Sequence, residues 1–178
     1  VFGLFNNQTQ SWKTSIQKHD TLDLHFRSAT HTETDFFILS IDNPALLYKT
    51  GDKGIMELVY MEEGEGVFYD SMNFWNDDEG IAIGDSTDGC LSVIITRDGG
   101  KTWTNLVKNI KELPAFAWVS TIEASRFNEG TAYITFDNHT QGDMNAYVYK
   151  TTDYGLTWTQ LGASTIKGYC HVIKEDLK

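Results

Sequence analysis

Acidic side chains recur at matching places in this sequence, each shortly after a short apolar segment. Such segments occupy 36–41, 80–84 and 131–136, and an aspartate follows each of them. If the loops after these segments converge, their carboxylates would share one rim, which could bind a cation or supply an acid and base pair. The rim candidates are Asp42, Asp85, Asp88, Asp137, His139 and Asp143.

The alternative for these acids is a turn-forming role, because Asp and Asn side chains bond the local backbone without any ligand. Their spacing does not match an EF-hand, and one histidine among scattered acids is weak support for zinc. We favour the turn-forming role. We therefore expect no metal site and no cofactor, and a bound divalent cation remains the alternative.

Two other acids, Asp70 and Glu123, are the candidates for catalysis, since they fall in segments 68–74 and 118–124 that each begin a predicted unit of four strands. A glycoside hydrolase needs only two carboxyl groups at a suitable separation. Neither acid lies in a recognisable catalytic motif, and no Ser-His-Asp order or P-loop is present. We favour a role that is not enzymatic.

Two eight-residue segments, 96–103 and 151–158, share the pattern Thr-x-Asp-x-Gly-x-Thr-Trp. An Asp in a turn accepts backbone N–H bonds, a Gly adopts positive φ, and Thr and Trp start an outgoing strand. The pattern therefore predicts a hairpin turn with a structural role. Its residues are Thr96, Asp98, Gly100, Thr102, Trp103, Thr151, Asp153, Gly155, Thr157 and Trp158.

Weaker copies of the pattern end at Trp12 and at Leu58. Measured at this last position, the four copies at 12, 58, 103 and 158 are separated by 46, 45 and 55 residues. Even repeats of this length are typical of the blades of a β-propeller. The fifteen Gly, two Pro and 13% aromatic residues also favour short strands and tight turns.

The sequence thus predicts an all-β chain, in which residues 1–178 form a single propeller-type domain of four-stranded antiparallel blades. We expect blades at about 22–62, 67–107 and 117–162, a partial blade at 1–16, and the first strand of a further blade at 169–173. About four to eight blades usually close a ring. The terminal pieces could join into a fourth blade, a homodimer could complete the ring, or the chain could be an excerpt.

With these repeats, the sequence resembles the Asp-box, or BNR-repeat, superfamily of β-propellers, which shares the fold of sialidases. Residues 68–72 and 80–85 resemble bacterial propellers similar to photosystem II assembly factors. Residues 118–125, 130–133 and 147–155 resemble sortilin-like and xyloglucanase-like propellers. This change of resemblance leads to the hypothesis of a junction near residues 106–117, which is natural, engineered or an artefact of how the sequence was assembled.

A sialidase would need several arginines to clamp a sugar carboxylate. The sequence has only Arg27, Arg97 and Arg126, and Arg97 lies inside one of the repeat turns. We therefore exclude sialidase activity. Tyr69 and Trp118, like Trp75, could stack on sugar rings, but we expect them to fill the space between blades.

The net charge of −11 argues against a nucleic-acid partner, and no apolar segment is long enough to insert into a membrane as a helix. The sequence begins at Val1, so we expect that an upstream segment such as a secretion signal preceded it. We therefore expect the protein to be located outside the cytoplasm. A trimmed sequence would look the same. Cys90 and Cys170 are 80 positions apart, and we expect two free thiols although a disulfide stays open.

Three hypotheses about function remain. The first is a non-catalytic binding or scaffold module for a protein or a glycan, including carbohydrate binding. The second is a glycoside hydrolase-like module that acts on a neutral polysaccharide. The third is an engineered or recombined propeller fragment without a ligand.

Overall fold

The computed structural model describes residues 2–6, 8–15, 19–20, 24–41, 43–50, 55–87, 90–114 and 117–177. These residues form an all-β chain with three four-stranded antiparallel sheets and a separate two-stranded hairpin. The three sheets are called the first, second and third blades below. The predicted all-β class, with four-stranded antiparallel sheets, is confirmed.

The strands of each blade are paired in chain order. The first blade contains β3 (Phe26–His31), β4 (Phe36–Ser40), β5 (Ala45–Thr50) and β6 (Met56–Glu62). The second contains β7 (Phe68–Phe74), β8 (Gly80–Thr87), β9 (Cys90–Thr96) and β10 (Thr104–Asn105). The third contains β11 (Trp118–Ala124), β12 (Ala132–Asp137), β13 (Tyr147–Thr151) and β14 (Thr159–Gln160).

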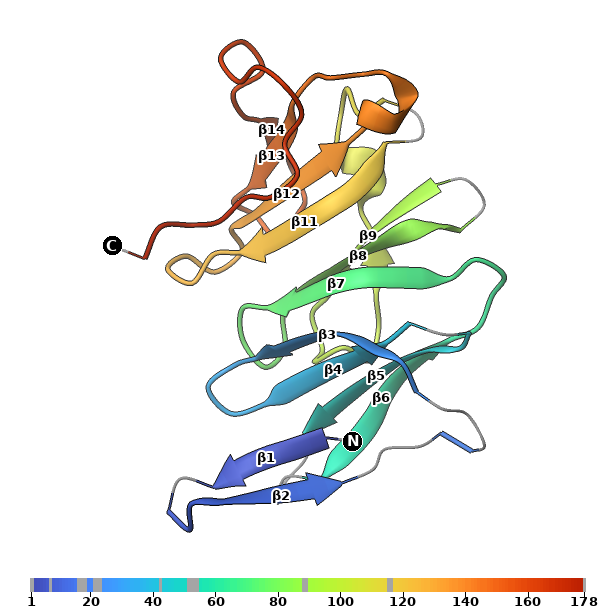
Figure 1. Cartoon of the computed structure of the whole chain (residues 1–178), viewed down its shortest axis with the longest axis vertical. Helices are drawn as coiled ribbons and strands as arrows, with labels where there is room; N and C mark the ends of the chain where they lie inside the picture. The colour runs from blue at the N-terminus through green and yellow to red at the C-terminus, as the bar shows by residue number, and fades with distance from the viewer. Residues whose placement is uncertain are drawn as a thin grey trace.

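The blades stack side by side, so that their first strands β3, β7 and β11 follow one another across the molecule (Figure 1). These three are called the inner strands. Short 3-10 helices, η1 (Val107–Asn109) and η2 (His139–Gln141), lie after β10 and β12. No helix in the described parts of the chain is both long and apolar enough to span a lipid bilayer.

The hairpin of β1 (Phe2–Asn6) and β2 (Ser11–Ser15) lies at one end of the stack, beyond the first blade, whereas the C-terminal segment runs along the third blade (Figure 1). The hairpin forms its own two-stranded sheet. The segment 169–173, expected to be a strand, has no strand structure and belongs to an extended C-terminal segment beside the third blade. In this structure the terminal pieces therefore do not join into one blade.

Apolar side chains fill the spaces between neighbouring blades. One cluster joins the first and second blades and includes Phe37, Leu47 and Phe74. The rings of Phe37 and Phe74 stack, with 3.7 Å between their centroids. A second cluster joins the second and third blades and includes Ile83 and Phe136. Blades on either side of the supposed junction at 106–117 thus share one continuous core.

The two strong repeats form turns with the same hydrogen bonds, at the ends of β9 and β13 (Figure 1). Asp98 accepts bonds from the backbone N–H of Thr102 at 2.9 Å and from its hydroxyl at 2.6 Å, and Asp153 accepts the same two bonds from Thr157 at the same distances. The tryptophan indole of each turn donates to the carbonyl of the turn's glycine, Gly100 or Gly155.

The glycine of the repeat is needed both for backbone conformation and for space. Gly100 has φ of +88°, and a Cβ there would lie 2.4 Å from Leu47 of the first blade. Gly155 has φ of +79°. Each turn therefore shapes its own hairpin, and at Gly100 it also lets the neighbouring blade approach closely.

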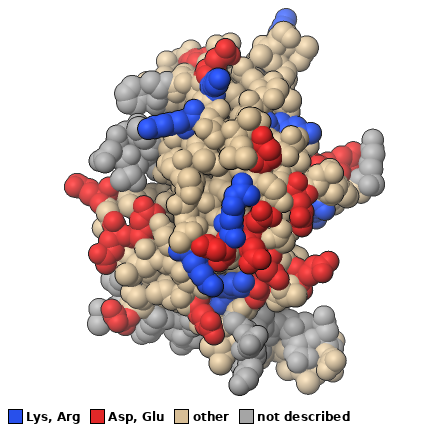
Figure 2. Space-filling model, turned by 180° about the vertical axis from the view of Figure 1, so that it is seen from behind, with Lys and Arg blue, Asp and Glu red and all other residues tan. Residues whose placement is uncertain are grey.

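Acidic and basic side chains are mixed on the surface. On the described part of the face in Figure 2, basic side chains lie singly or in small groups among acidic ones. The ion pairs Lys49–Asp35 at 2.8 Å and Arg97–Glu79 at 3.3 Å are examples of this local pairing.

Candidate functional site

Each inner strand contains one β-bulge, at a corresponding place in each blade. The pairing between β3 and β4 shifts between Phe26 and Ser28, so Arg27 is an extra residue on its strand. The same shift makes Asp70 extra on β7 and Ser120 extra on β11. Bulges redirect side chains and are frequent beside functional sites.

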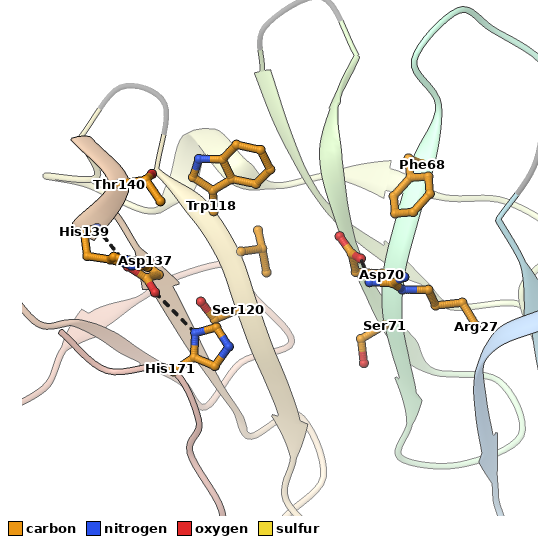
Figure 3. A pocket seen from close by; sticks show the side chains of 11 residues that line it. Arg27, Phe68, Asp70, Ser71, Trp118, Ser120, Asp137, His139, Thr140 and His171 are labelled. Atoms are coloured by element: carbon orange, nitrogen blue, oxygen red, sulfur yellow. Dashed lines mark hydrogen bonds and ion pairs between the residues drawn. The ribbon is translucent and has the colours of Figure 1, made fainter. Parts of the chain in front are cut away.

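All three bulge residues line one pocket of about 570 Å³, which is called the inner-strand pocket below. Its walls come from the inner strands, the end of β12, η2 and the C-terminal segment, with the third blade on one side and β7 with β3 on the other (Figure 3). The lining residues are Arg27, Phe68, Asp70, Ser71, Trp118, Val119, Ser120, Asp137, His139, Thr140 and His171.

One wall holds an ion pair. The Nη2 atom of Arg27 lies 2.8 Å from Oδ1 of Asp70, and the same guanidinium lies over the ring of Phe68 at 5.5 Å from its centroid. This pair joins the first blade to the second. It also means that the charge of Asp70 already has a counter-charge inside the pocket.

The opposite wall holds Asp137 between two histidines (Figure 3). Nδ1 of His139 lies 2.6 Å from one carboxylate oxygen and Nδ1 of His171 lies 3.2 Å from the other. Because an ionised carboxylate only accepts hydrogen bonds, both ring nitrogens donate. Burial raises the pKa of Asp137, but bonds from the backbone and ring of His139 and from His171 outweigh it, and the net pKa is lowered.

His171 reaches the pocket because the C-terminal segment is fixed to the third blade. Its carbonyl accepts bonds from Thr121 and Thr135, at 3.0 and 3.3 Å. Further along the segment, Lys174 pairs with Glu123. The segment therefore forms part of the pocket wall.

The candidate catalytic acids are separated by this arrangement. Asp70 lines the pocket, whereas Glu123 does not, since its buried side chain is paired with Lys174 on the C-terminal segment. Asp70 and Asp137 instead face the pocket from opposite walls (Figure 3).

The predicted rim residues are only partly brought together. Asp137 and His139 line the pocket. Asp143 does not, and it accepts bonds from residues close to it in the chain, from the Tyr147 hydroxyl at 2.6 Å and the Asn145 backbone at 3.0 Å. Asp42 and Asp88, like the side chain of Asp85, lie outside what the structure describes.

Trp118 differs from the expectation that it would fill the space between blades. Its side chain is 54% exposed and lines the pocket, whereas Tyr69 is buried as expected and Trp75 is half-buried beside the core of the second and third blades. Trp118 is the first residue of β11 and lines the pocket instead of the space between blades.

Sequence reasoning missed Arg27, Ser120 and His171 as pocket residues. The repeat could have indicated the first two, because Arg27, Asp70 and Ser120 occupy the same place in successive blades. His171 carried no such signal, since its position depends on how the C-terminal segment packs.

The described residues contain no group of three or more His, Cys, Asp or Glu side chains that could hold a metal ion. Cys170 is a half-buried free thiol, and the Cys90 side chain lies outside the described parts. To a ligand, the pocket offers the Arg27–Asp70 ion pair, the Asp137 carboxylate with its two histidines, and the exposed indole of Trp118.

No family model and no curated protein matches this chain. Among solved structures, it is similar to YCF48 bound to D1 peptide, with a TM-score of 0.54 and 20% identity over 78% of this chain and 40% of that chain. It is also similar to the Niastella koreensis GH74 enzyme, with a TM-score of 0.51 and 18% identity over 76% of this chain and 22% of that chain.

The chain spans less than half the length of either of these two structures. At 20% and 18% identity, the likeness concerns the fold. Together with the three four-stranded sheets, it shows that this chain is built from β-propeller blades.

Proposed function

We propose that this protein is a non-catalytic binding module whose inner-strand pocket takes a short segment of a partner protein. The proposal rests on the contacts of the pocket residues: the carboxylates of Asp70 and Asp137 already have partners, while the Trp118 ring remains exposed. Exposed aromatic rings in a concave site supply much of the contact energy in protein recognition.

The charges of the pocket favour binding over hydrolysis. A glycoside hydrolase needs a carboxylic acid that keeps its proton near neutral pH, which requires a raised pKa. The pKa of Asp137 is lowered instead, because the bonds from His139 and His171 outweigh the effect of burial. Asp70 is paired with Arg27, so both acids of the pocket already have partners.

A peptide is the preferred ligand class because the pocket is open and combines aromatic, charged and imidazole side chains. The structure of YCF48 was determined with a bound peptide, and it therefore provides a precedent for peptide binding by a similar fold. A glycan is the second candidate. It is favoured by one observation, the exposed Trp118 ring beside polar groups, since indole rings stack on sugars.

We further propose that the chain belongs to the Asp-box group of propellers. The support is the pair of turns at 96–103 and 151–158, in which equivalent hydrogen bonds agree in length within about 0.1 Å. Such agreement at two sites with different neighbours is expected when the residues of the turn itself determine its hydrogen bonds.

The test is to select ligands from a random peptide library and from a glycan array, and to compare the wild type with Trp118→Ala. The matched control is Phe127→Ala, because Phe127 is 56% exposed but does not line the pocket. We expect selected peptides to bind the wild type and the control, and to lose about tenfold in affinity with Trp118→Ala.

Equal affinity of both variants would contradict the proposed site. Selection of glycans alone would favour the second candidate. Hydrolysis of β-glucan or xyloglucan that disappears in Asp70→Asn would overturn the non-catalytic proposal and establish the enzyme hypothesis.

A further inference from the structure

A second pocket, of about 220 Å³, lies between the outer parts of the first and second blades. Its walls come from β6, β9 and β10, and from β7 through Tyr69. The residues that matter for its chemistry are Tyr60, Glu62, Tyr69 and Trp103. None of them lines the inner-strand pocket.

Glu62 is held in place by two phenols. The hydroxyls of Tyr60 and Tyr69 donate to the same carboxylate oxygen, Oε2, at 2.9 and 2.6 Å. Among the described residues, the hydrogen bonds to Glu62 all end on Oε2. A carboxylate has about four acceptor positions on two oxygens, so Oε1 remains able to accept a bond from a ligand.

The two tyrosines stay donors across the physiological pH range. Burial, the hydrogen bond to Glu62 and its charge together raise the pKa of Tyr60 to about 12. The same causes raise the pKa of Tyr69 well above its usual value. The carboxylate is therefore fixed in orientation by neutral phenols.

Aromatic rings flank this carboxylate. The rings of Tyr60 and Trp103 lie 6.3 Å apart between centroids and are tilted by 57°. The indole N–H of Trp103 already donates to the carbonyl of Gly100 at 2.9 Å, so that its π face is what it can offer to a ligand. Ring faces attract cations, most strongly for Trp and Tyr.

The surroundings add negative charge. Glu63 and Glu65 are exposed and follow Glu62 closely in the chain, and no Lys or Arg is among the described residues that line the pocket. An anionic ligand would be repelled, and a neutral ligand would leave a partly buried carboxylate without a counter-charge.

From this combination we propose that the second pocket binds an organic ammonium group, such as the side chain of a lysine or a small free amine. The ammonium donates to Oε1 of Glu62 and lies against the rings of Tyr60 and Trp103. A volume of about 220 Å³ leaves room for the head group with several methylene groups.

The second pocket is independent of the inner-strand pocket, because β7 separates the two. Tyr69 faces the second pocket, whereas its neighbours Phe68 and Asp70 line the inner-strand pocket. A ligand of one pocket can therefore be lost while the other is retained.

The test titrates the intact chain with N-acetyl-lysine amide and with spermidine, and follows the Trp103 indole signal by NMR. N-acetyl-norleucine amide, similar in size but neutral, is the matched ligand control. We expect saturable shifts with an amine and none with the neutral control. A response to the lysine amide points to a protein source, and a response to spermidine alone points to a free amine.

The key variant is Glu62→Gln, which keeps the shape and removes the charge. Its control is Glu63→Gln, which removes an adjacent charge outside the pocket. We expect Glu62→Gln to weaken amine binding by about tenfold, and Glu63→Gln by about twofold or less. Melting curves of both variants check that they fold.

Equal shifts with the neutral and the cationic ligand would overturn the proposal, and this comparison needs only the wild-type chain. No shift of the Trp103 signal with either amine would overturn it as well. Undiminished amine binding by a folded Glu62→Gln variant would assign the binding to another place.

Discussion

Arg27 and Asp70 lie on adjacent inner strands, 2.8 Å apart from Nη2 to Oδ1, and each is the extra residue of a β-bulge. A side chain at a bulge departs from the regular alternation of its strand. Here the two departures meet and connect the first and second blades within one wall of the pocket. The pair is thus a product of two local irregularities and one tertiary contact.

Removing this ion pair should affect ligand binding more than stability. The Arg27 side chain is half exposed, and exposed ion pairs contribute about 0–1 kcal/mol. We expect Arg27→Gln to change the free energy of unfolding in urea by about 0.5 kcal/mol or less. Affinity for peptides selected on the wild type should fall severalfold, because a pocket wall loses its fixed orientation.

Arg97→Gln is the matched control for this experiment. Arg97 and Glu79 form an ion pair with the same exposed fractions, 50% and 22%, as Arg27 and Asp70, but they do not line the pocket. A loss of binding by Arg97→Gln as large as that by Arg27→Gln would show a general effect of charge.

Gly84 should be essential for the bulge at Asp70. Gly84 pairs with Tyr69, and a Cβ at Gly84 would lie 2.0 Å from the carbonyl oxygen of Phe68. The backbone would have to shift to accept it. We expect Gly84→Ala to lower the free energy of unfolding by about 3 kcal/mol, as measured by urea denaturation.

Gly142→Ala separates this steric effect from backbone conformation. Gly142 has φ of +78°, and a Cβ added there would meet nothing within 4 Å, so its substitution should cost only about 1 kcal/mol. Similar losses for the two variants would argue against the close approach at Gly84.

The two repeat turns should be energetically equivalent. We expect Asp98→Ala and Asp153→Ala each to lower the free energy of unfolding by about 2–3 kcal/mol, because each removes a carboxylate that accepts several hydrogen bonds. Chemical denaturation measures both. Losses that differ by more than about 1 kcal/mol would mean that the surroundings, and not the turn, determine the contribution.

These aspartates should also produce an acid-dependent loss of stability. Burial raises the pKa of Asp98, but bonds from Thr102 and Thr96 outweigh it, so the folded pKa lies below the unfolded value; Asp153 behaves alike. Their contribution is complete above the unfolded value near 3.8 and is lost as the pH falls through the folded pKa. Asp98→Asn should flatten the pH dependence of stability below about pH 4. An unchanged slope would contradict this assignment.

The ionisation of Asp143 should depend most strongly on one hydroxyl group, that of Tyr147. The Tyr147 hydroxyl is the largest of the causes that lower the pKa of Asp143 to about 2. We expect Tyr147→Phe to raise this pKa toward its ordinary value of 3.8, as measured by carbon-13 NMR of the carboxyl group. Tyr133→Phe, which removes a hydroxyl bonded to Glu175, is the control and should leave it unchanged.

Strand positions were well predicted where apolar residues recur along the whole segment. The expected strands 68–74 and 118–124 coincide with β7 and β11. The first blade was expected to begin at about residue 22, and its first strand is observed at Phe26–His31, with 21–23 outside the described residues. At 169–173 the apolar pattern suggested a strand, but the segment instead follows the third blade, where Thr121 and Thr135 bond the carbonyl of His171.

By itself, the sequence determined the repeat, its blade length and the turns at 96–103 and 151–158. Those turns depend on hydrogen bonds between residues at most four positions apart, which a local pattern can encode. The tertiary structure decided the pocket. It combined three bulges with His171, which bonds Asp137 from 34 positions away, and such contacts depend on how whole blades and the C-terminal segment pack.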